Sequence, residues 1–307
     1  MIAPAILSIA FSLGLCALSS PAKAQQPVGR YTVQNFPVGT YPIGVAFDGA
    51  NIWVANSSDD SLTKLRASDG APVGTFGVGD GPIGLAYDGV NIWVTNSNAD
   101  TVTKLRASDG TVEGTFAVGD GPVFIVFDGT NMWITNYFEN TVSKLRASDG
   151  TQVGIFPTGD SPYGLTFDGH AVWLANYGDG SVLKLAAASG RRLGQFRVGI
   201  DPEQLTFGHR KIWVTNSLNS TVTALRVSDG AVVGTYQVGG SPYGIAFDGH
   251  NIWTANKTSN TITGLRASDG HRFADIPLGE QPTGIVWDGS SLWVTNLFSN
   301  TVSKVTP

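Results

Sequence analysis

The chain repeats itself every 40 residues, and at two positions of the repeat some units carry an aromatic, acidic or basic side chain. Three of these residues follow a proline that opens a repeat: Tyr163, Glu203 and Tyr243. Three more lie one residue past a repeated asparagine: Tyr137, Tyr177 and Lys257. Brought together, they would combine aromatic faces with one carboxylate and one ammonium group, a set suited to binding a small polar or glycan-like molecule. Drift of exposed loops is the alternative explanation of the same differences between repeats.

The elements that must position these residues are marked by tryptophan. Seven tryptophans stand 40 residues apart, each followed three positions later by asparagine: Trp53, Trp93, Trp133, Trp173, Trp213, Trp253 and Trp293. A period of this length with strand-like content indicates a repeat architecture, because each unit can bury its apolar face only by stacking on its neighbours. We therefore expect one domain, although 307 residues could hold two.

Each repeat predicts four short strands. In the first repeat we expect strands over residues 43–47, 51–55, 61–67 and 73–78. Asp-Gly pairs fall between them at 48–49 and 69–70. Asp-Gly between apolar strands is a strong hairpin signal, because glycine accepts the positive φ that the turn requires. The repeat is thus a four-stranded antiparallel meander.

The two ends of the repeated region complement each other. The last repeat, Pro282 to Pro307, has three of the four strands, and Tyr31–Gly39 matches the missing outer strand. If residues 31–39 complete that last blade, the units close into a ring with only short, protected edges. The sequence therefore predicts an all-β fold, a seven-bladed β-propeller over residues 31–307. An open solenoid is the alternative, but complementary half-blades have no purpose there and capping segments are absent.

Residues 1–24 read as a secretory signal peptide. An apolar run from Ile2 to Leu18 precedes Ala22-Lys23-Ala24, which fits a small-x-small cleavage site. The usual positive n-region is missing, so retention of the segment as an anchor is the alternative. Residues 25–30 would be a linker. We expect the mature chain to be periplasmic or extracellular, with no membrane span.

Cysteine usage and charge exclude several chemistries. Cys16 is the only cysteine and lies in the predicted signal, so the mature chain would hold neither disulfides nor thiolate metal sites. The chain has 19 basic and 24 acidic residues, a net charge of −5, and loss of Lys23 with the signal would make it more negative. This balance argues against nucleic-acid binding, which relies on clustered Lys and Arg.

Other polar residues recur too regularly to indicate a site. The asparagine after each tryptophan is better explained as a local turn cap than as a ring of oxygen ligands. Lys64 and Arg66 recur in several repeats, and ion pairing and packing between blades explain them better than a basic binding stripe. Three histidines from separate blades would lie on the rim opposite Glu203, where exposed turn histidines are commoner than a metal site: His170, His209 and His250.

The phrase Trp-Val-Thr-Asn at 93–96, 213–216 and 293–296, with Trp-Val-Ala-Asn at 53–56, resembles the 40-residue YVTN family of β-propeller repeats. The resemblance extends from Phe36 to the C-terminus and includes the Pro-x-Gly opening and the Asp-Gly turn. It implies a secreted or surface-exposed bacterial or archaeal propeller, often one without an assigned activity.

The repeat is also similar, more distantly, to the streptogramin-lyase propellers. The resemblance implies a catalytic histidine after the opening proline of late blades and a glutamate at the end of the second strand, acting with a magnesium ion. Here no histidine follows an opening proline, and every second strand ends in asparagine. Only Glu203 offers an acid at the matching position, so the lyase machinery is absent as a set.

These observations favour a monomeric binding scaffold that acts through one face of the ring, without a cofactor. Its partner would be a small polar ligand, a glycan or a protein. The alternative is a lyase- or lactonase-like enzyme with a divalent metal, Mg²⁺ or Ca²⁺, at the channel mouth and Glu203 as its catalytic acid or base. A third interpretation, DNA binding, would require a basic patch that the charge balance does not indicate.

Overall fold

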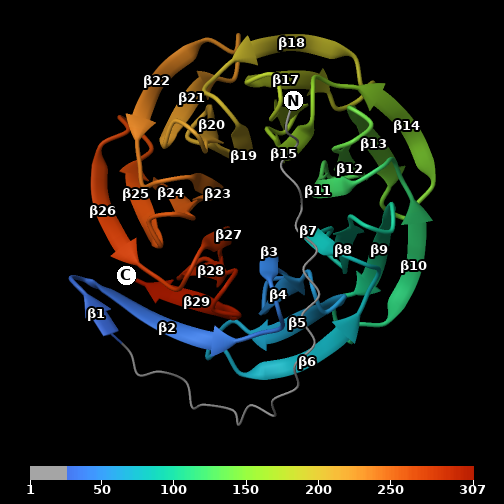
Figure 1. The fold of residues 1–307 in the computed structure, drawn as a ribbon. Helices are drawn as coiled ribbons and strands as arrows, with labels where there is room; N and C mark the ends of the chain where they lie inside the picture. Colours follow the sequence, from blue (N-terminus) through green and yellow to red (C-terminus); the bar gives the residue numbers. More distant parts are fainter. Residues whose placement is uncertain (1–25) are drawn as a thin grey trace.

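The computed structural model describes residues 26–307, and every regular element in this range is a β-strand (Figure 1). The strands form seven antiparallel sheets arranged in a ring, so the predicted seven-bladed β-propeller is confirmed. The predicted signal peptide and Cys16 lie outside the described residues. Within residues 26–307 no helix is long and apolar enough to cross a membrane.

Each blade is an antiparallel sheet of four strands, which are given below in order from the channel outwards. The first blade comprises β3 (Pro42–Phe47), β4 (Asn51–Asn56), β5 (Ser61–Arg66) and β6 (Pro72–Gly77). Blades two and three comprise β7 (Pro82–Tyr87), β8 (Asn91–Asn96), β9 (Thr101–Arg106), β10 (Val112–Ala117), β11 (Pro122–Phe127), β12 (Asn131–Asn136), β13 (Thr141–Arg146) and β14 (Gln152–Pro157). Blades four and five comprise β15 (Pro162–Phe167), β16 (Ala171–Asn176), β17 (Ser181–Ala186), β18 (Arg192–Arg197), β19 (Pro202–Gly208), β20 (Lys211–Asn216), β21 (Thr221–Arg226) and β22 (Val232–Gln237). Blades six and seven comprise β23 (Pro242–Phe247), β24 (Asn251–Asn256), β25 (Thr261–Arg266), β26 (Arg272–Pro277), β27 (Pro282–Trp287), β28 (Leu292–Asn296), β29 (Thr301–Thr306) and β2 (Tyr31–Pro37).

The ring is closed by strands from the two ends of the chain. β2 pairs antiparallel with β29, from Thr32 opposite Thr306 to Pro37 opposite Thr301, and Figure 1 shows the blue strand beside the red one. One part of the prediction was wrong: Gln26–Val28, inside the expected linker 25–30, is a strand, β1, that pairs with β2. The reason is that β2 would otherwise present an open edge, and the chain turns back at Gly29 to cover it.

The tryptophans form the core between blades. All seven are at most 2% exposed, and six indole N–H groups donate to an aspartate five residues earlier, over 2.7–2.8 Å. Blade five has no aspartate in this turn, and Trp213 donates instead to the carbonyl oxygen of Gly208, over 3.2 Å. The repeated Asp-Gly turn therefore both reverses the chain and satisfies a buried indole.

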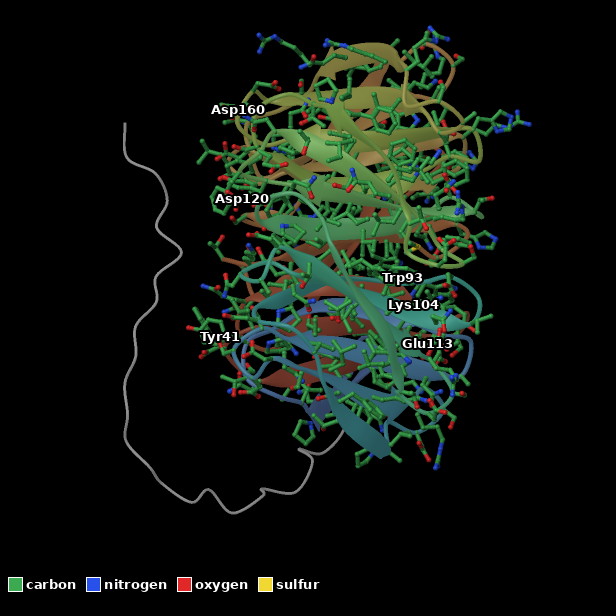
Figure 2. All side chains as sticks on the ribbon, turned by 90° about the vertical axis from the view of Figure 1, so that its right-hand side faces the viewer. Tyr41, Trp93, Lys104, Glu113, Asp120 and Asp160 are labelled. Carbon is green, nitrogen blue, oxygen red and sulfur yellow. The ribbon has the colours of Figure 1, made fainter. Side chains whose placement is uncertain are left out.

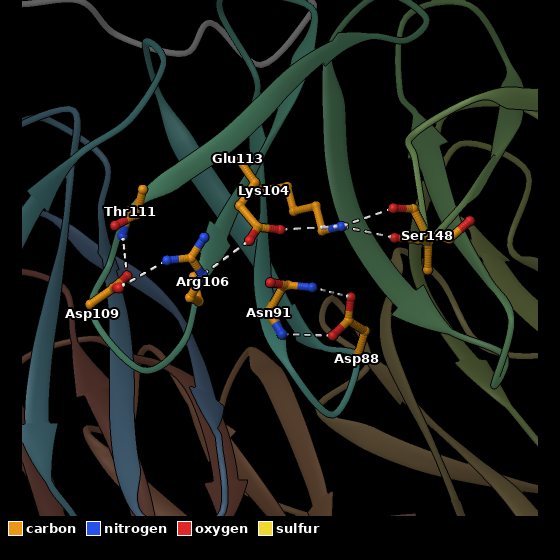
Figure 3. Close-up of polar contacts among 9 residues, drawn as sticks. Asp88, Asn91, Lys104, Arg106, Asp109, Thr111, Glu113 and Ser148 are labelled. Carbon is orange, nitrogen blue, oxygen red and sulfur yellow. Dashed lines mark hydrogen bonds and ion pairs between the residues drawn. The ribbon is translucent and has the colours of Figure 1, made fainter.

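Lysines on the third strand join neighbouring blades. The Nζ atom of Lys104 donates to the carbonyl oxygens of Ala147 and Ser148 in the next blade, at 3.2 and 3.3 Å, and lies 3.4 Å from Glu113 (Figure 3). It also lies 5.4 Å from the ring centroid of Trp93. The lysines thus cap the turns of the following blade, as the expected packing between blades requires. The expected ion pairing of the arginines is confirmed, since Arg66 and its equivalents pair with an aspartate three residues later, within their own turn.

In blade five the equivalent contact with the next blade is made by a lysine from another strand. It has Ala224 at the lysine position, and Lys211 of β20 donates instead to the carbonyl oxygens of Ala267 and Ser268, at 3.0 and 3.1 Å. Its Nζ atom lies 5.2 Å from the ring centroid of Trp213. A lysine on the neighbouring strand therefore replaces the missing one.

Candidate functional site

A β-bulge at the start of each inner strand places the residues that follow the opening prolines. In blade five, Pro202 pairs with Asn216 but Leu205 pairs with Val214, so the inner strand carries one extra residue at Glu203 and Gln204. The same register shift occurs in all seven blades. Because bulges re-aim side chains, this shift turns the post-proline residues toward one mouth of the central channel.

The repeated asparagines hold the loops of the same rim. In blade one, the Nδ2 atom of Asn56 donates to Ser61 and Thr63, and its Oδ1 atom accepts from the amide of Gly39, at 3.0 Å. All seven asparagines are fully buried. Their expected role as local caps is confirmed where Oδ1 accepts from a backbone amide, over 2.9–3.2 Å, in four blades: Asn56, Asn96, Asn176 and Asn216. Figure 2 shows this rim, with Tyr41, Asp120 and Asp160, on the opposite side of the ring from Lys104 and Glu113.

The four tyrosines predicted at the rim form a single group. The ring centroid of Tyr163 lies 6.0 Å from that of each of the other three: Tyr137, Tyr177 and Tyr243. The hydroxyl oxygens of Tyr163 and Tyr243 lie 3.0 Å apart. We refer to these four tyrosines, together with Phe124, Glu203 and Lys257, as the tyrosine cluster.

Glu203 is the acid of the tyrosine cluster, and its side chain is buried. It is 8% exposed, and burial raises its pKa to about 7, against the opposing effect of the Lys257 charge. The Nζ atom of Lys257 lies 3.6 Å from the ring centroid of Tyr243. Burial lowers the pKa of Lys257, and the Glu203 charge opposes this effect. The site therefore holds a carboxyl group that exchanges its proton near neutral pH beside an ammonium group on an aromatic face.

The phenol groups of Tyr163, Tyr177 and Tyr243 stay protonated. Burial raises the pKa of Tyr163 and Tyr243, and the Glu203 charge raises both further. The pKa of Tyr177 is raised by burial and by the charges of Asp201 and Glu203. The cluster thus offers hydroxyl donors and aromatic faces rather than phenolate nucleophiles.

Phe124 belongs to the cluster but is not among the residues predicted from the sequence. Its ring centroid lies 5.2 Å from that of Tyr163 and 6.2 Å from that of Tyr243, so it reaches from blade three to blade six. Five other blades have glycine at this position, and a Cβ at Gly84 or Gly164 would clash with the next blade's carbonyl oxygen. A phenylalanine in place of that glycine was the signal that could have identified it.

Below the cluster the central channel narrows to a cavity of about 100 Å³. Its wall contains one polar side chain, that of Gln204, and backbone exposed at glycines, and Phe124 forms part of it together with leucines and isoleucines of the inner strands. The cavity is smaller than typical small-molecule sites, which are several hundred Å³. A ligand of the cluster would therefore contact the rim rather than the depth of the channel.

The residues present do not fit a divalent metal. Within residues 26–307 no group of three His, Cys, Asp or Glu side chains lies close enough to hold a metal ion. The carboxyl group of Glu203 is accompanied by the Lys257 ammonium group, which would repel a cation. His170, His209 and His250 are exposed on turns of the opposite rim.

Comparison with known proteins extends the description of the fold. No protein-family model matches the sequence, and none of the curated proteins matches it. A solved structure of Kuenenia stuttgartiensis hydrazine synthase is 20% identical, with a TM-score of 0.78, over 88% of this chain and 97% of that one. A streptogramin B lyase structure is 19% identical, also with a TM-score of 0.78, over 90% of this chain and 97% of that one. The likeness is one of fold. The propeller fold is thus shared with proteins that are named as enzymes, and such a shared fold does not fix a function.

Proposed function

We propose that this protein is a binding protein that takes a small polar ligand, such as a saccharide, on the tyrosine cluster. The observation that carries the proposal is the convergence of all six sequence-predicted residues on one rim, around the buried Glu203. Aromatic faces beside a few convergent polar groups are typical of such sites. We further propose the YVTN repeat type and a periplasmic or extracellular location, on the strength of the repeated Trp-Val-Thr-Asn phrase and the apolar leader.

The proposal is tested by a calorimetric screen of monosaccharides, disaccharides and polyols. A ligand of the cluster should bind at least ten-fold more weakly to Tyr163→Ala than to the unmodified protein. The control variant His170→Ala changes an exposed residue of the opposite rim and should leave affinity within two-fold. If no compound binds, or if both variants bind equally well, the assignment of the rim is wrong.

A second candidate function is favoured by the pKa of Glu203. A carboxyl group whose pKa is about 7 can act as a general acid or base at neutral pH. A lyase- or lactonase-like reaction would then depend on Glu203, without the divalent metal first considered for it. Turnover of lactone or cyclic ester substrates that is lost in Glu203→Gln would favour this candidate. Binding without turnover in both proteins would favour the scaffold.

A further inference from the structure

The loop between the second and third strands of blade four lacks a side chain that most other blades possess. Its fourth residue is Gly180, with a φ of +66°. Five blades have Asp or Asn here, at φ between 49° and 58°: Asp60, Asp100, Asn140, Asn260 and Asn300. In each of these five, the Oδ1 atom accepts a hydrogen bond of 2.7–3.1 Å from an amide of the loop that enters the next blade.

The amide that corresponds in blade four is that of Asp201. The two preceding amides are satisfied, since Gly199 donates to Asn216 at 2.9 Å and Ile200 to Asn219 at 2.6 Å. For the N–H of Asp201, residues 26–307 provide no acceptor. Gly180 therefore leaves one backbone donor of this loop without the oxygen that an Asp or Asn side chain supplies in most other blades.

A cavity of about 350 Å³ occupies this place between blades four and five. Its wall includes Tyr177, which belongs to the tyrosine cluster, and the acidic residues Asp179 and Asp201. Arg197 also lines it, and makes no ion pair within the described part of the chain. Most other blades have small or cyclic residues at the Arg197 position, such as Gly77, Ala117 and Pro157, and blade five has Gln237.

The charged residues of the cavity wall favour a ligand group that is uncharged and accepts a hydrogen bond. Asp179, Asp201 and Arg197 line the cavity, so the charge of its wall is negative on balance and would repel a ligand carboxylate. Three of the five side chains that fill this place elsewhere are asparagines, whose acceptor is an uncharged amide oxygen. A ligand amide group can replace such a side chain, its carbonyl oxygen accepting from the Asp201 amide.

The remaining wall residues suit a sugar ring that bears such an amide. The face of Tyr177 can pack on the apolar face of a pyranose, and the carboxylate of Asp201 can accept from its hydroxyl groups. The carboxylate of Asp179 already accepts from the Asp160 amide, Ser181 and Gln195. A second cavity of about 340 Å³ shares four wall residues with the first and continues along blade five toward Thr235 and Gln237. This continuation provides room for a second sugar unit.

We propose that the cavity at Gly180 binds the acetamido group of an N-acetylated amino sugar, with the amide of Asp201 as donor to its carbonyl oxygen. This inference rests on the proposed binding function and names its ligand class. The sugar ring would lie against Tyr177, at the edge of the tyrosine cluster.

The test is calorimetric titration of N-acetylglucosamine, glucosamine and glucose into the full chain. N-Acetylglucosamine should bind at least ten-fold more tightly than the two sugars that lack the acetyl group. Gly180→Asn restores the side chain that other blades possess, and should weaken this binding at least ten-fold. Ser220→Asn makes the matched change in blade five and should leave it within two-fold.

A Cβ at Gly180 would lie 3.0 Å from the carbonyl oxygen of Gly199, so the fold of Gly180→Asn must be checked by thermal unfolding. Amide hydrogen exchange of the unmodified protein avoids this difficulty, since added N-acetylglucosamine should slow exchange at Asp201. Equal affinity for glucose, unchanged binding to Gly180→Asn, or unchanged exchange at Asp201 would overturn the proposal. If other polar compounds still bind at Tyr163, only the assignment of the amino sugar fails. An asparagine-containing tripeptide that binds at Gly180 where the sugar does not would show that the cavity takes peptides.

Discussion

The hydroxyl oxygens of Tyr163 and Tyr243 lie 3.0 Å apart although the two residues are 80 positions apart in the sequence. They belong to blades four and six, and blade five contributes Glu203 between them. The contact shows that the bulges of three successive inner strands bring their post-proline side chains to one point at the channel mouth.

Removal of one hydroxyl group should weaken the cluster without disrupting the ring. We expect Tyr163→Phe to lower the free energy of unfolding by about 1 kcal/mol, because Tyr243, only 3% exposed, loses its hydrogen-bond partner. Urea unfolding followed by tryptophan fluorescence measures this change. The double variant Tyr163→Phe, Tyr243→Phe should cost less than the sum of the two single changes, and strict additivity would contradict the contact.

The carboxyl group of Glu203 should make stability depend on pH between about 4.5 and 7. Its pKa is about 7 in the folded protein, against an ordinary value of 4.5, so the folded state binds the additional proton in this window. The stabilising contribution is complete below the lower value and is lost as pH rises through the higher one, a change of about 3 kcal/mol.

Unfolding at pH 5 and pH 8 tests this pH dependence. Compared with the unmodified protein, Glu203→Gln should lose less stability between the two pH values. The control Glu280→Gln alters an exposed rim residue and should follow the unmodified protein. Identical pH profiles for all three proteins would show that Glu203 titrates as an ordinary carboxyl group.

We expect Lys211 to stabilise blade five by as much free energy as the third-strand lysines stabilise other blades. We expect Lys211→Met to lower the free energy of unfolding by about 2 kcal/mol, because it leaves the carbonyl oxygens of Ala267 and Ser268 without their charged donor. Adding Ala224→Lys to this variant restores the usual arrangement and should recover most of the loss. Failure of that rescue in urea unfolding would refute the equivalence of the two positions.

We expect the packing of Phe36 to stabilise β2 as much as the equivalent aromatic residues stabilise the outer strands of the other blades. Its ring centroid lies 5.5 Å from that of Trp293, and that of Phe76 lies 5.3 Å from Trp53. Truncation of either phenylalanine to alanine should cost about 3 kcal/mol. A much smaller loss for Phe36→Ala, measured by thermal unfolding beside Phe76→Ala, would mean that β2 contributes little to closure.

The architecture could be predicted because strict periodicity leaves few arrangements of the chain. The period of 40 residues, the Asp-Gly turns and the complementary ends of the chain together require a closed ring. The same periodicity places Tyr163, Glu203 and Tyr243 at equivalent points of neighbouring blades. Their meeting at one rim could therefore be predicted without knowledge of any side-chain contact.

What could not be predicted depends on contacts across the ring or between blades. Phe124 lies in an apolar strand, and only the structure shows it reaching Tyr243 three blades away. The replacement of a lysine at position 224 by Lys211 requires the register of β20 against β21. The free amide of Asp201 becomes evident only when the loops of all the blades are compared in space.

The central claim is that the tyrosine cluster is the ligand-binding surface of this protein. The most direct measurement is an NMR titration of saccharides with and without N-acetyl groups, which follows the ring resonances of Tyr163, Tyr177 and Tyr243. We predict that at least one saccharide shifts all three in a saturable manner, and that Tyr163→Ala abolishes the effect on the other two. Ring resonances that stay unchanged while residues of the opposite rim respond, or that respond to no compound, would contradict the claim.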